Sequence, residues 1–283
     1  MVKNLKLRLI VEDSISSEKK SLGLKAEHGL SMVIETTKPD VNILIDTGQK
    51  YNTLKRNIEA LGINIKRIDV IFLSHGHYDH TGGLEILRET KGRITVIAHP
   101  EIFAPKFKIQ PYLKYIGIPF HPCQIELLGG KLLLARNPVK IAEGIKTTGE
   151  IDRITEYEKT VGFWTVKEAS FMKDLMRDDQ SLVVNLENKG LVIISGCAHS
   201  GIINTIKQAQ RVMNEKNIFA VIGGFHLINA NSKRIEKTLD DLIKLDIFQV
   251  YPCHCTGKEA VTKFQRYLEE RCKPINTGDA ISF

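Results

Sequence analysis

The 283-residue sequence has no hydrophobic run that approaches the ~20 apolar residues of a membrane-spanning helix. This absence argues against a membrane protein, and no membrane partner is expected. Residues 1–8 alternate polar and apolar side chains, which is typical of a β-strand and not of a secretion signal. We therefore expect a cytoplasmic protein.

Cysteine is also scarce. An odd number of cysteines dispersed through a long chain does not form a disulfide framework. Cys253 and Cys255 flank His254 as in a metal clip, but the chain has no second pair at zinc-finger spacing. Cys123 and Cys272 are expected to be small buried hydrophobic residues. The five cysteines lie at positions 123, 197, 253, 255 and 272.

The chain lacks a dense run of lysine and arginine, although its net charge is +7 and its isoelectric point is near 9.0. A basic protein of this kind binds nucleic acid or smaller anions. Without a basic run or a basic-aromatic array, we expect no nucleic acid and favour a small phosphate-bearing substrate or a dispersed basic surface. Lys106, Lys108 and Arg153 are candidate phosphate contacts, with simple surface charge the favoured interpretation of each.

Against these absences, residues 74–83 concentrate metal-binding side chains: three histidines and one aspartate lie within six positions, directly after an apolar run. Imidazole and carboxylate groups are the usual ligands of zinc and similar divalent metals. In an extended segment His75 and His77 point to the same side. The glycines of this segment permit a turn that brings Asp79 and His80 toward them. Two histidines can then serve one metal while the Asp-His pair serves a second.

The hydrophobic pattern predicts alternating strands and helices throughout the chain. It indicates a sandwich of two mixed sheets with helices on both outer faces, in a single domain over residues 1–283. Five prolines interrupt the pattern over residues 99–140, where we expect an excursion across the site. The predicted strands are residues 5–10 (an edge strand), 29–35, 41–45, 70–73, 94–98, 132–134, 139–141, 181–186, 191–194, 218–222 and 248–251. The predicted helices are residues 52–61, 84–90, 202–212, 235–245 and 258–271.

Three further histidines, His199, His226 and His254, each follow a predicted strand in a segment with glycine or cysteine neighbours. The carboxyl ends of strands are where open α/β sheets place their ligand crevices. A single histidine of this kind is more often structural. Three in the same position, beside a strong metal motif, favour a shared site.

The His-x-His-x-Asp-His segment with its trailing Gly-Gly resembles the signature of the metallo-β-lactamase superfamily. This resemblance implies a four-layer αββα sandwich with a metal site at the strand ends. It implies that Asp79 contacts the second metal and the metal-bound water, and so acts in catalysis. By the same resemblance Asp46 orients the metal loop through hydrogen bonds, and His254 is the last histidine ligand.

Two departures from the family pattern are visible. The family carries a histidine before a hairpin, but residues 177–181 contain none, and the bridging aspartate position corresponds to Cys197. His199 is therefore expected to replace the missing ligand, while Cys197 is either a ligand or a bystander. His226 is a candidate metal or substrate contact. Asp178 and Asp179 either approach the site or form an ordinary turn cluster.

With these departures, the sequence resembles one branch of the superfamily, the dihydropteroate-synthase-like group. The motifs that carry this resemblance are at residues 74–84, 196–202, 223–227 and 252–257. The resemblance extends from residue 27 to residue 279. It implies transfer of a pterin with loss of diphosphate to a carbon or nitrogen nucleophile. Tyr78, Trp164 and Phe225 are candidates for stacking on a pterin ring, although aromatic residues are more often core.

Three functions remain open from the sequence. The first is a metal-dependent transferase acting on a phosphate- or diphosphate-bearing small molecule such as a pterin. The second is a metal-dependent hydrolase that cleaves a phosphoester with a metal-bound hydroxide. The third is a non-catalytic metal-binding or iron redox protein, which would be coloured when purified. In each case we expect divalent metal ions, two in number, with zinc favoured over iron, manganese or magnesium.

Overall fold

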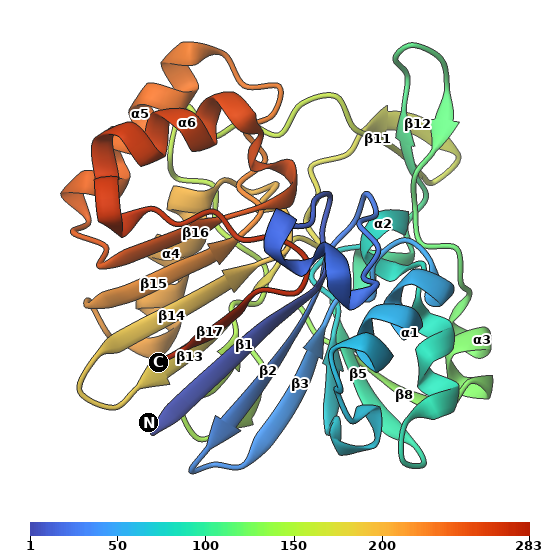
Figure 1. Ribbon diagram of the computed structural model, residues 1–283. Coiled ribbons are helices and arrows are strands. Elements are labelled where there is room, and N and C mark those ends of the chain that lie inside the picture. Colours follow the sequence, from blue (N-terminus) through green and yellow to red (C-terminus); the bar gives the residue numbers. More distant parts are fainter.

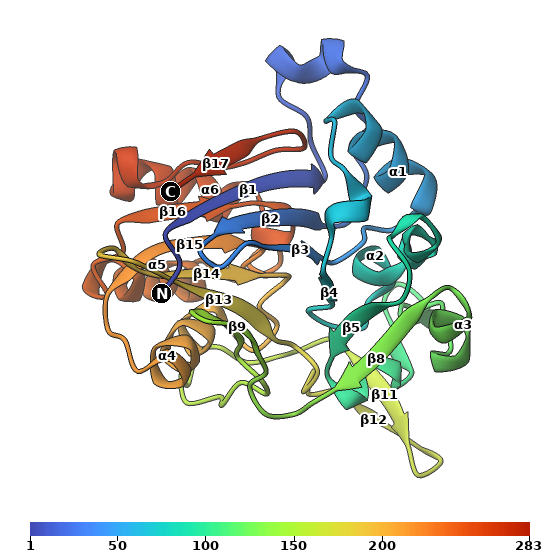
Figure 2. The ribbon, with the colours of Figure 1, turned by 90° about the horizontal axis from the view of Figure 1, so that it is seen from below.

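A computed structural model describes all residues from 1 to 283. Two large β-sheets pack face to face, and a layer of helices covers the outer face of each (Figure 1). The view from below separates the four layers, with α1 to α3 on one side and α4 to α6 on the other (Figure 2). The helices are α1 (Tyr51–Ala60), α2 (Tyr78–Thr81), α3 (Pro122–Leu127), α4 (Ile202–Met213), α5 (Ser232–Lys244) and α6 (Lys258–Leu268). The predicted αββα sandwich of two mixed sheets is confirmed.

The first sheet contains strands from the N-terminal half of the chain and one from its C-terminus. Its strands are β1 (Asn4–Val11), β2 (Ser31–Thr37), β3 (Val41–Ile45), β4 (Val70–Phe72), β5 (Ile94–Ala98), β8 (Gly130–Leu134) and β17 (Ala280–Ser282). They are arranged in the order β17-β1-β2-β3-β4-β5-β8. Pairing is antiparallel from β17 to β3 and parallel from β3 to β8.

The second sheet repeats this arrangement. Its strands are β9 (Lys140–Ala142), β10 (Ile145–Thr147), β13 (Ser181–Leu186), β14 (Gly190–Ser195), β15 (Ile218–Gly223) and β16 (Gln249–Pro252). The order is β16-β15-β14-β13-β10-β9, with β14, β15 and β16 parallel. Helices α4 and α5 follow β14 and β15, as crossovers between parallel strands require.

Alternation along the strands creates the core between the sheets. In β14, Val192 and Ile194 face the first sheet, whereas Leu191 and Ile193 face the helices. Leu7 of β1 and Phe72 of β4 come from the other side of the same inter-sheet cluster, and both are fully buried. Each sheet has one further apolar cluster on its other face, between the sheet and its helices. Every layer is therefore joined to the next by apolar contact, which is the main stabilising term in such a fold.

A third, small sheet lies beside the sandwich. Its strands are β6 (Lys106–Lys108), β7 (Lys114–Tyr115), β11 (Trp164–Lys167) and β12 (Ser170–Lys173), in the order β12-β11-β6-β7. The β11–β12 hairpin projects from the body of the molecule in Figure 2. Two distant segments of the chain meet in this sheet, since β6 and β7 come from the proline-rich region and β11 and β12 do not.

Three local predictions were wrong. The strand predicted at residues 5–10 is not at an edge, because the C-terminal β17 pairs with its outer side. Residues 84–90 form the 3-10 helix η3 (Leu84–Glu89) instead of an α-helix. Cys123 is exposed, because it lies in the short helix α3, whereas Cys272 is buried as expected. No helix in the structure has the length and apolar character needed to cross a membrane.

The inter-sheet core predicts a clear difference between two identical substitutions. Leu7→Ala removes a fully buried side chain and leaves a cavity between the sheets, so it should lower the free energy of unfolding by about 2–5 kcal/mol. Leu127→Ala is the control, because Leu127 is 87% exposed and its loss should change stability by less than about 0.5 kcal/mol. Urea denaturation measures both. Equal effects would contradict the packing described here.

Candidate metal centre

Five strands end at one edge of the sandwich, and the segment after each carries one or more of the expected site residues. The strands are β3, β4, β14, β15 and β16. In that order, the residues are Asp46; His75, His77, Asp79 and His80; Cys197 and His199; His226; and His254. The structure brings these residues together from segments as far apart as positions 46 and 254, at the strand ends where the sequence placed them.

Asp46 is fully buried behind the metal-binding loop. Its Oδ1 accepts a hydrogen bond from the backbone N–H of Ser74 at 2.8 Å, and its Oδ2 accepts one from the Ser74 hydroxyl at 2.7 Å. Oδ2 also lies 2.7 Å from Nδ1 of His80. A carboxylate in this position fixes the proton of His80 on Nδ1, so that the Nε2 lone pair faces inward.

One group of three imidazoles consists of His75, His77 and His199. His75 Nε2 lies 2.9 Å from His77 Nδ1 and 3.2 Å from His199 Nε2. Burial lowers the pKa of all three rings well below the usual value for histidine, and neighbouring imidazoles lower it further. All three are therefore neutral at pH 7 and have a lone pair available.

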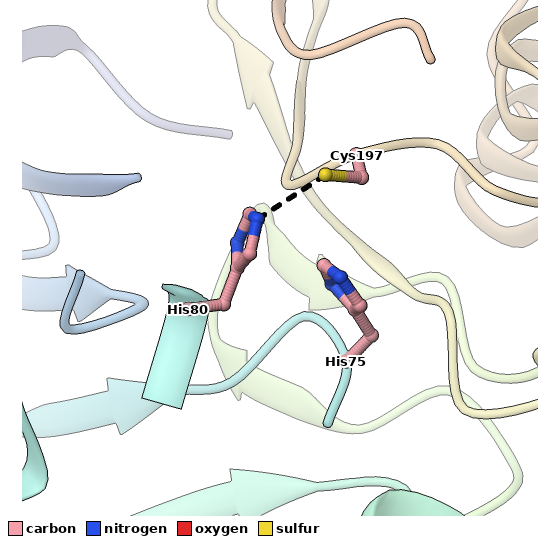
Figure 3. A group of neighbouring side chains, drawn as sticks. All are labelled: His75, His80 and Cys197. Carbon is pink, nitrogen blue, oxygen red and sulfur yellow. Dashed lines mark hydrogen bonds between the residues drawn. The ribbon is translucent and has the colours of Figure 1, made fainter. Parts of the chain in front are cut away.

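A second group lies beside the first and contains Asp79, His80 and His254. His80 Nε2 is 3.3 Å from His254 Nε2, and Asp79 Oδ2 is 3.6 Å from the same His254 nitrogen. Cys197 Sγ approaches His80 Nε2 to 3.2 Å, and His75, His80 and Cys197 lie within reach of one ion (Figure 3). Although burial opposes ionisation, His80 and His254 hold the pKa of Asp79 well below its usual value.

The hydrogen bonds outside the cluster show that these nitrogens fit a cation. The Ser74 hydroxyl donates to Asp46, so it accepts from Nδ1 of His75 at 2.9 Å and leaves Nε2 of His75 unprotonated. That lone pair then faces His199 Nε2 and His77 Nδ1. His77 Nε2 and His199 Nδ1 have no partner at all, although both are buried. These two are the outer nitrogens of their rings, because His77 Nδ1 and His199 Nε2 face His75. The inner nitrogens of the three rings converge on one place, as the ligands of a divalent metal do.

Residues 177–181, where the family pattern has a histidine, support the loop from behind. Asp178 Oδ2 accepts the backbone N–H of Gly76 at 2.8 Å, and its Oδ1 pairs with Lys106 Nζ at 2.8 Å. Asp179 accepts the backbone N–H of Ser200 at 2.8 Å, next to His199. Asp178 and Asp179 thus reach the loops that carry the cluster and do not point into it.

Lys106 is 1% exposed and forms a second ion pair, with Asp174 Oδ2 at 3.2 Å. Burial alone would lower the pKa of Lys106, but Asp178 and Asp174 outweigh it and the pKa is raised. Lys106 is therefore a buried structural cation, and the interpretation of it as a phosphate contact or a surface charge was wrong. In the sequence Lys106 lies between Pro105 and Phe107 and two residues before another lysine, and this pattern gives no sign of burial.

The other predicted substrate contacts divide into two sets. Tyr78 and Lys108 line the cavity over the cluster. Arg153 donates to the carbonyls of Leu175 and Met176 instead of facing that cavity. Phe225 is fully buried against Phe264 in the helix-side core, so it cannot stack on a substrate.

The cavity over the cluster has a volume of about 360 Å³. Asp13, His28 and Phe163 are among the lining residues that sequence reasoning missed. His28 is more than half exposed, and its two ring nitrogens lie 3.2 Å from Asp13 Oδ2 and 3.3 Å from Asp79 Oδ2. Asp13 also holds His254 Nδ1 at 2.8 Å. The sequence pattern Glu-His-Gly around His28 was the only available signal.

His226 and Phe163 form one wall of this cavity. The His226 ring lies 4.3 Å from that of His199, and Phe163 lies 4.9 Å from His199 and 5.1 Å from His77. Nδ1 of His226 is buried without a partner. His226 therefore lies beside the imidazole cluster and lines the cavity.

Comparison with known proteins agrees with this geometry. Residues 24–163 match the family model of the metallo-β-lactamase superfamily. Together with the full-length relatives described next, this match shows that the chain belongs to that superfamily. The chain is 35% identical to the 7,8-dihydropterin-6-methyl-4-(β-D-ribofuranosyl)-aminobenzene-5'-phosphate synthase of Methanocaldococcus jannaschii. The alignment covers the whole of this chain and 98% of the relative. The expected class, a metallo-β-lactamase-fold enzyme, is confirmed.

Two further similarities cover most of the chain. An uncharacterised protein of the same organism is 35% identical over 85% of this chain and 88% of its own length. The crystal structure of Tm1679, a metal-dependent hydrolase of the β-lactamase superfamily, superposes with a TM-score of 0.82 at 29% identity, over 98% of both chains. The similarity thus includes the second half of the sandwich as well as the first.

The buried ion-pair cluster behind the loop predicts the effect of removing its cation. Lys106→Met leaves Asp174 and Asp178 buried without a counter-charge, so the free energy of unfolding should fall by about 3–5 kcal/mol. Lys108→Met, two residues along the same strand, is the control, because Lys108 forms no ion pair and its change should be small. Denaturant titration of both variants tests this. A loss in K108M as large as that in K106M would contradict the assignment.

Proposed function

We propose that this protein is a metal-dependent enzyme that acts on a phosphate- or diphosphate-bearing small molecule, and that it transfers a pterin group with loss of diphosphate. The observation that carries the proposal is the cluster of inward-facing lone pairs on buried, neutral histidines beside an ionised Asp79. The cations and aromatic rings around the cavity and the 35% identity to a pterin-phosphate synthase support the substrate class.

In this proposal His75, His77 and His199 hold one divalent ion, and Asp79, His80 and His254 hold a second. Cys197 lies next to His80 and also within reach of His75 and His199, so its sulfur would be available to either ion. Zinc suits this donor set better than magnesium, because imidazole and thiolate are zinc ligands whereas magnesium prefers oxygen. When bound, such ions neutralise the negative charge that develops on a phosphoryl leaving group.

The cavity walls match a molecule that combines an aromatic ring with a phosphate. Lys108 Nζ lies 5.4 Å above the ring of Phe163, and Lys114 Nζ lies 5.4 Å above that of Tyr78. Neither lysine forms an ion pair with a carboxylate, so both charges are available to a ligand. The aromatic rings offer flat surfaces for a heterocycle, as stacking requires.

In the transfer reaction, the bond between the pterin methyl carbon and the diphosphate oxygen breaks, and diphosphate leaves with the electron pair. The nitrogen of an aminobenzene forms the new bond to that carbon and then releases one proton. The Asp79 carboxylate faces the cavity between His28 and His254, where it can accept a hydrogen bond and orient the attacking group. His28 extends from Asp79 to Asp13 at the cavity mouth, on a path by which a proton can leave.

Hydrolysis of a phosphoester is the second candidate function. The high structural similarity to Tm1679, a metal-dependent hydrolase, favours it. In that case water takes the place of the amine, and Asp79 orients the water. The same residues serve both reactions, so the substrates that fit the cavity decide between them.

We further propose that residues 1–283 work as one domain, with the segment over residues 99–140 covering the site. In support of this, β8 at the end of the segment pairs with β5 of the first sheet. Gln110, Pro111 and Tyr112 from its middle line the cavity over the histidines.

Elemental analysis tests the two ligand groups. The purified protein should contain about two metal ions per chain, and His80→Ala and His199→Ala should each reduce this content. His121→Ala is the matched control, because His121 is the exposed N-cap residue of α3 and belongs neither to the histidine groups nor to the cavity lining, and it should leave the content unchanged. A metal content that stays the same in H199A would exclude His199 as a ligand.

The reaction is tested with the metal-loaded enzyme, a dihydropterin methyl diphosphate and 4-(β-D-ribofuranosyl)aminobenzene 5'-phosphate. Release of diphosphate should require both organic substrates and should fall by at least about 100-fold in Asp79→Asn, which keeps the shape but removes the charge. Phosphodiesters are assayed in parallel. Diphosphate release without the amine, or phosphodiester cleavage alone, would replace the transferase with the hydrolase.

A further inference from the structure

The cavity over the histidine cluster is not isolated. A second cavity of about 720 Å³ adjoins it, and the two share Lys108, Gln110, Phe163, His226 and Asn229 as lining residues. The shared wall contains the two side chains, Phe163 and His226, that contact the cluster. A molecule in the second cavity therefore lies next to whatever the cluster binds.

Positive charge gathers on the walls of the second cavity. Lys108, Lys173 and Arg234 come from three elements, β6, β12 and α5, and none of them forms an ion pair. Of the three, Arg234 gives the strongest indication of a ligand. One of its terminal nitrogens donates to the carbonyl of Lys159 at 3.2 Å, but its Nε is buried without any partner.

The acidic groups near these cations are occupied elsewhere. Asp174 lines the second cavity, but its Oδ2 pairs with Lys106 at 3.2 Å and its Oδ1 accepts the backbone N–H of Met176 at 2.7 Å. Glu158 interacts with Arg234 at longer range, while its oxygens accept the backbone N–H groups of Ile203 and Asn204. The unpaired cations are therefore free to bind an anion.

The remaining walls are aromatic and amide groups. Trp164 is stacked on Phe171 across the β11–β12 hairpin, with ring centroids 5.0 Å apart, and its position is thereby fixed. Phe163 lies at the junction with the metal cavity, and Gln110 and Asn229 add hydrogen-bonding groups. An anion-binding end and an aromatic junction suit a ligand with a phosphate at one end and an aryl group at the other.

We propose that the second cavity is the acceptor subsite, which binds a phosphorylated aryl amine with its phosphate at Arg234 and Lys173 and its ring toward Phe163. This inference rests on the proposed transfer, because only a transfer holds two organic substrates at once. The diphosphate of the donor belongs to the metal cavity, where the cluster and Lys114 lie. A hydrolase has no need of the second compartment, since water is its other substrate.

The test is a calorimetric titration of the metal-loaded full-length protein with 4-(β-D-ribofuranosyl)aminobenzene 5'-phosphate and with the same compound lacking the phosphate. Arg234→Gln and Lys173→Gln should each weaken binding of the phosphorylated compound by roughly tenfold or more, as loss of a charge-assisted contact implies. Neither should change binding of the dephosphorylated compound. Arg234→Lys should restore part of the affinity.

Two control variants, Lys233→Gln and Lys167→Gln, lose the same charge nearby. Lys233 is next to Arg234 on α5, and Lys167 is on β11, the strand that pairs with the β12 strand of Lys173. Both residues are exposed and outside the cavity. Both should bind like the wild type, within about twofold. Equal weakening in the controls would reduce the effect to overall charge and overturn the subsite.

The outcome is separable from that of the proposed function. If the wild type binds the aryl phosphate through Arg234 but forms no coupled product, the subsite stands and the pterin transfer fails. If the wild type forms the product while R234Q and K173Q keep the wild-type KM for the acceptor, the transfer stands and the subsite is wrong. No binding of the phosphorylated compound by the wild type would also overturn the subsite.

Discussion

The site depends on the orientation of imidazole rings whose outer nitrogens are held by acceptors. Asp46 binds His80 directly and His75 through the Ser74 hydroxyl, and Asp13 binds His254. Because their outer nitrogens carry the proton, His75 and His80 turn the lone pairs of their inner nitrogens toward the cluster. His254 differs, since Asp13 and Asp79 outweigh its burial and raise the pKa of its ring well above the usual value. Facing lone pairs repel, so the rings stay in place only on rigid supports. The two packed sheets provide this rigidity, since all these residues lie at strand ends fixed by the inter-sheet core.

The sequence predicted the parts of this arrangement that are local. Six consecutive positions contain four candidate ligands, and period-two alternation in strands such as β14 reveals both faces of the sandwich. The sequence did not predict contacts between residues that are far apart along the chain. The residues around Lys106 do not indicate that Asp178 is its partner. The pairing of β17 with β1 likewise joins segments from opposite ends of the chain. Phe225 follows a glycine pair at a strand end, as a site residue would, yet its ring turns into the helix-side core.

The buried Lys106 cluster links the site to the segments that cover it. Lys106 begins β6 of the small sheet, Asp174 follows β12, and Asp178 holds the backbone of Gly76 between His75 and His77. A buried ion pair contributes little net stability, because the desolvation of both charges offsets their attraction. It does define position, since a charge without its partner is costly. The cluster therefore fixes the small sheet, and with it the wall containing Lys108, relative to the histidines.

In the proposed metal centre, Cys197 distinguishes the donor set from one built on a bridging carboxylate. Burial raises the pKa of its thiol, so the sulfur keeps its proton until a cation displaces it. A metal ion held at this position would displace that proton and leave a thiolate next to His80. A thiolate transfers more negative charge to the metal than a carboxylate does, and the metal attracts electrons from water less strongly as a result. A centre of this kind activates water less, and the second, cationic cavity beside it offers room for an organic acceptor in place of water, as the proposed transfer requires.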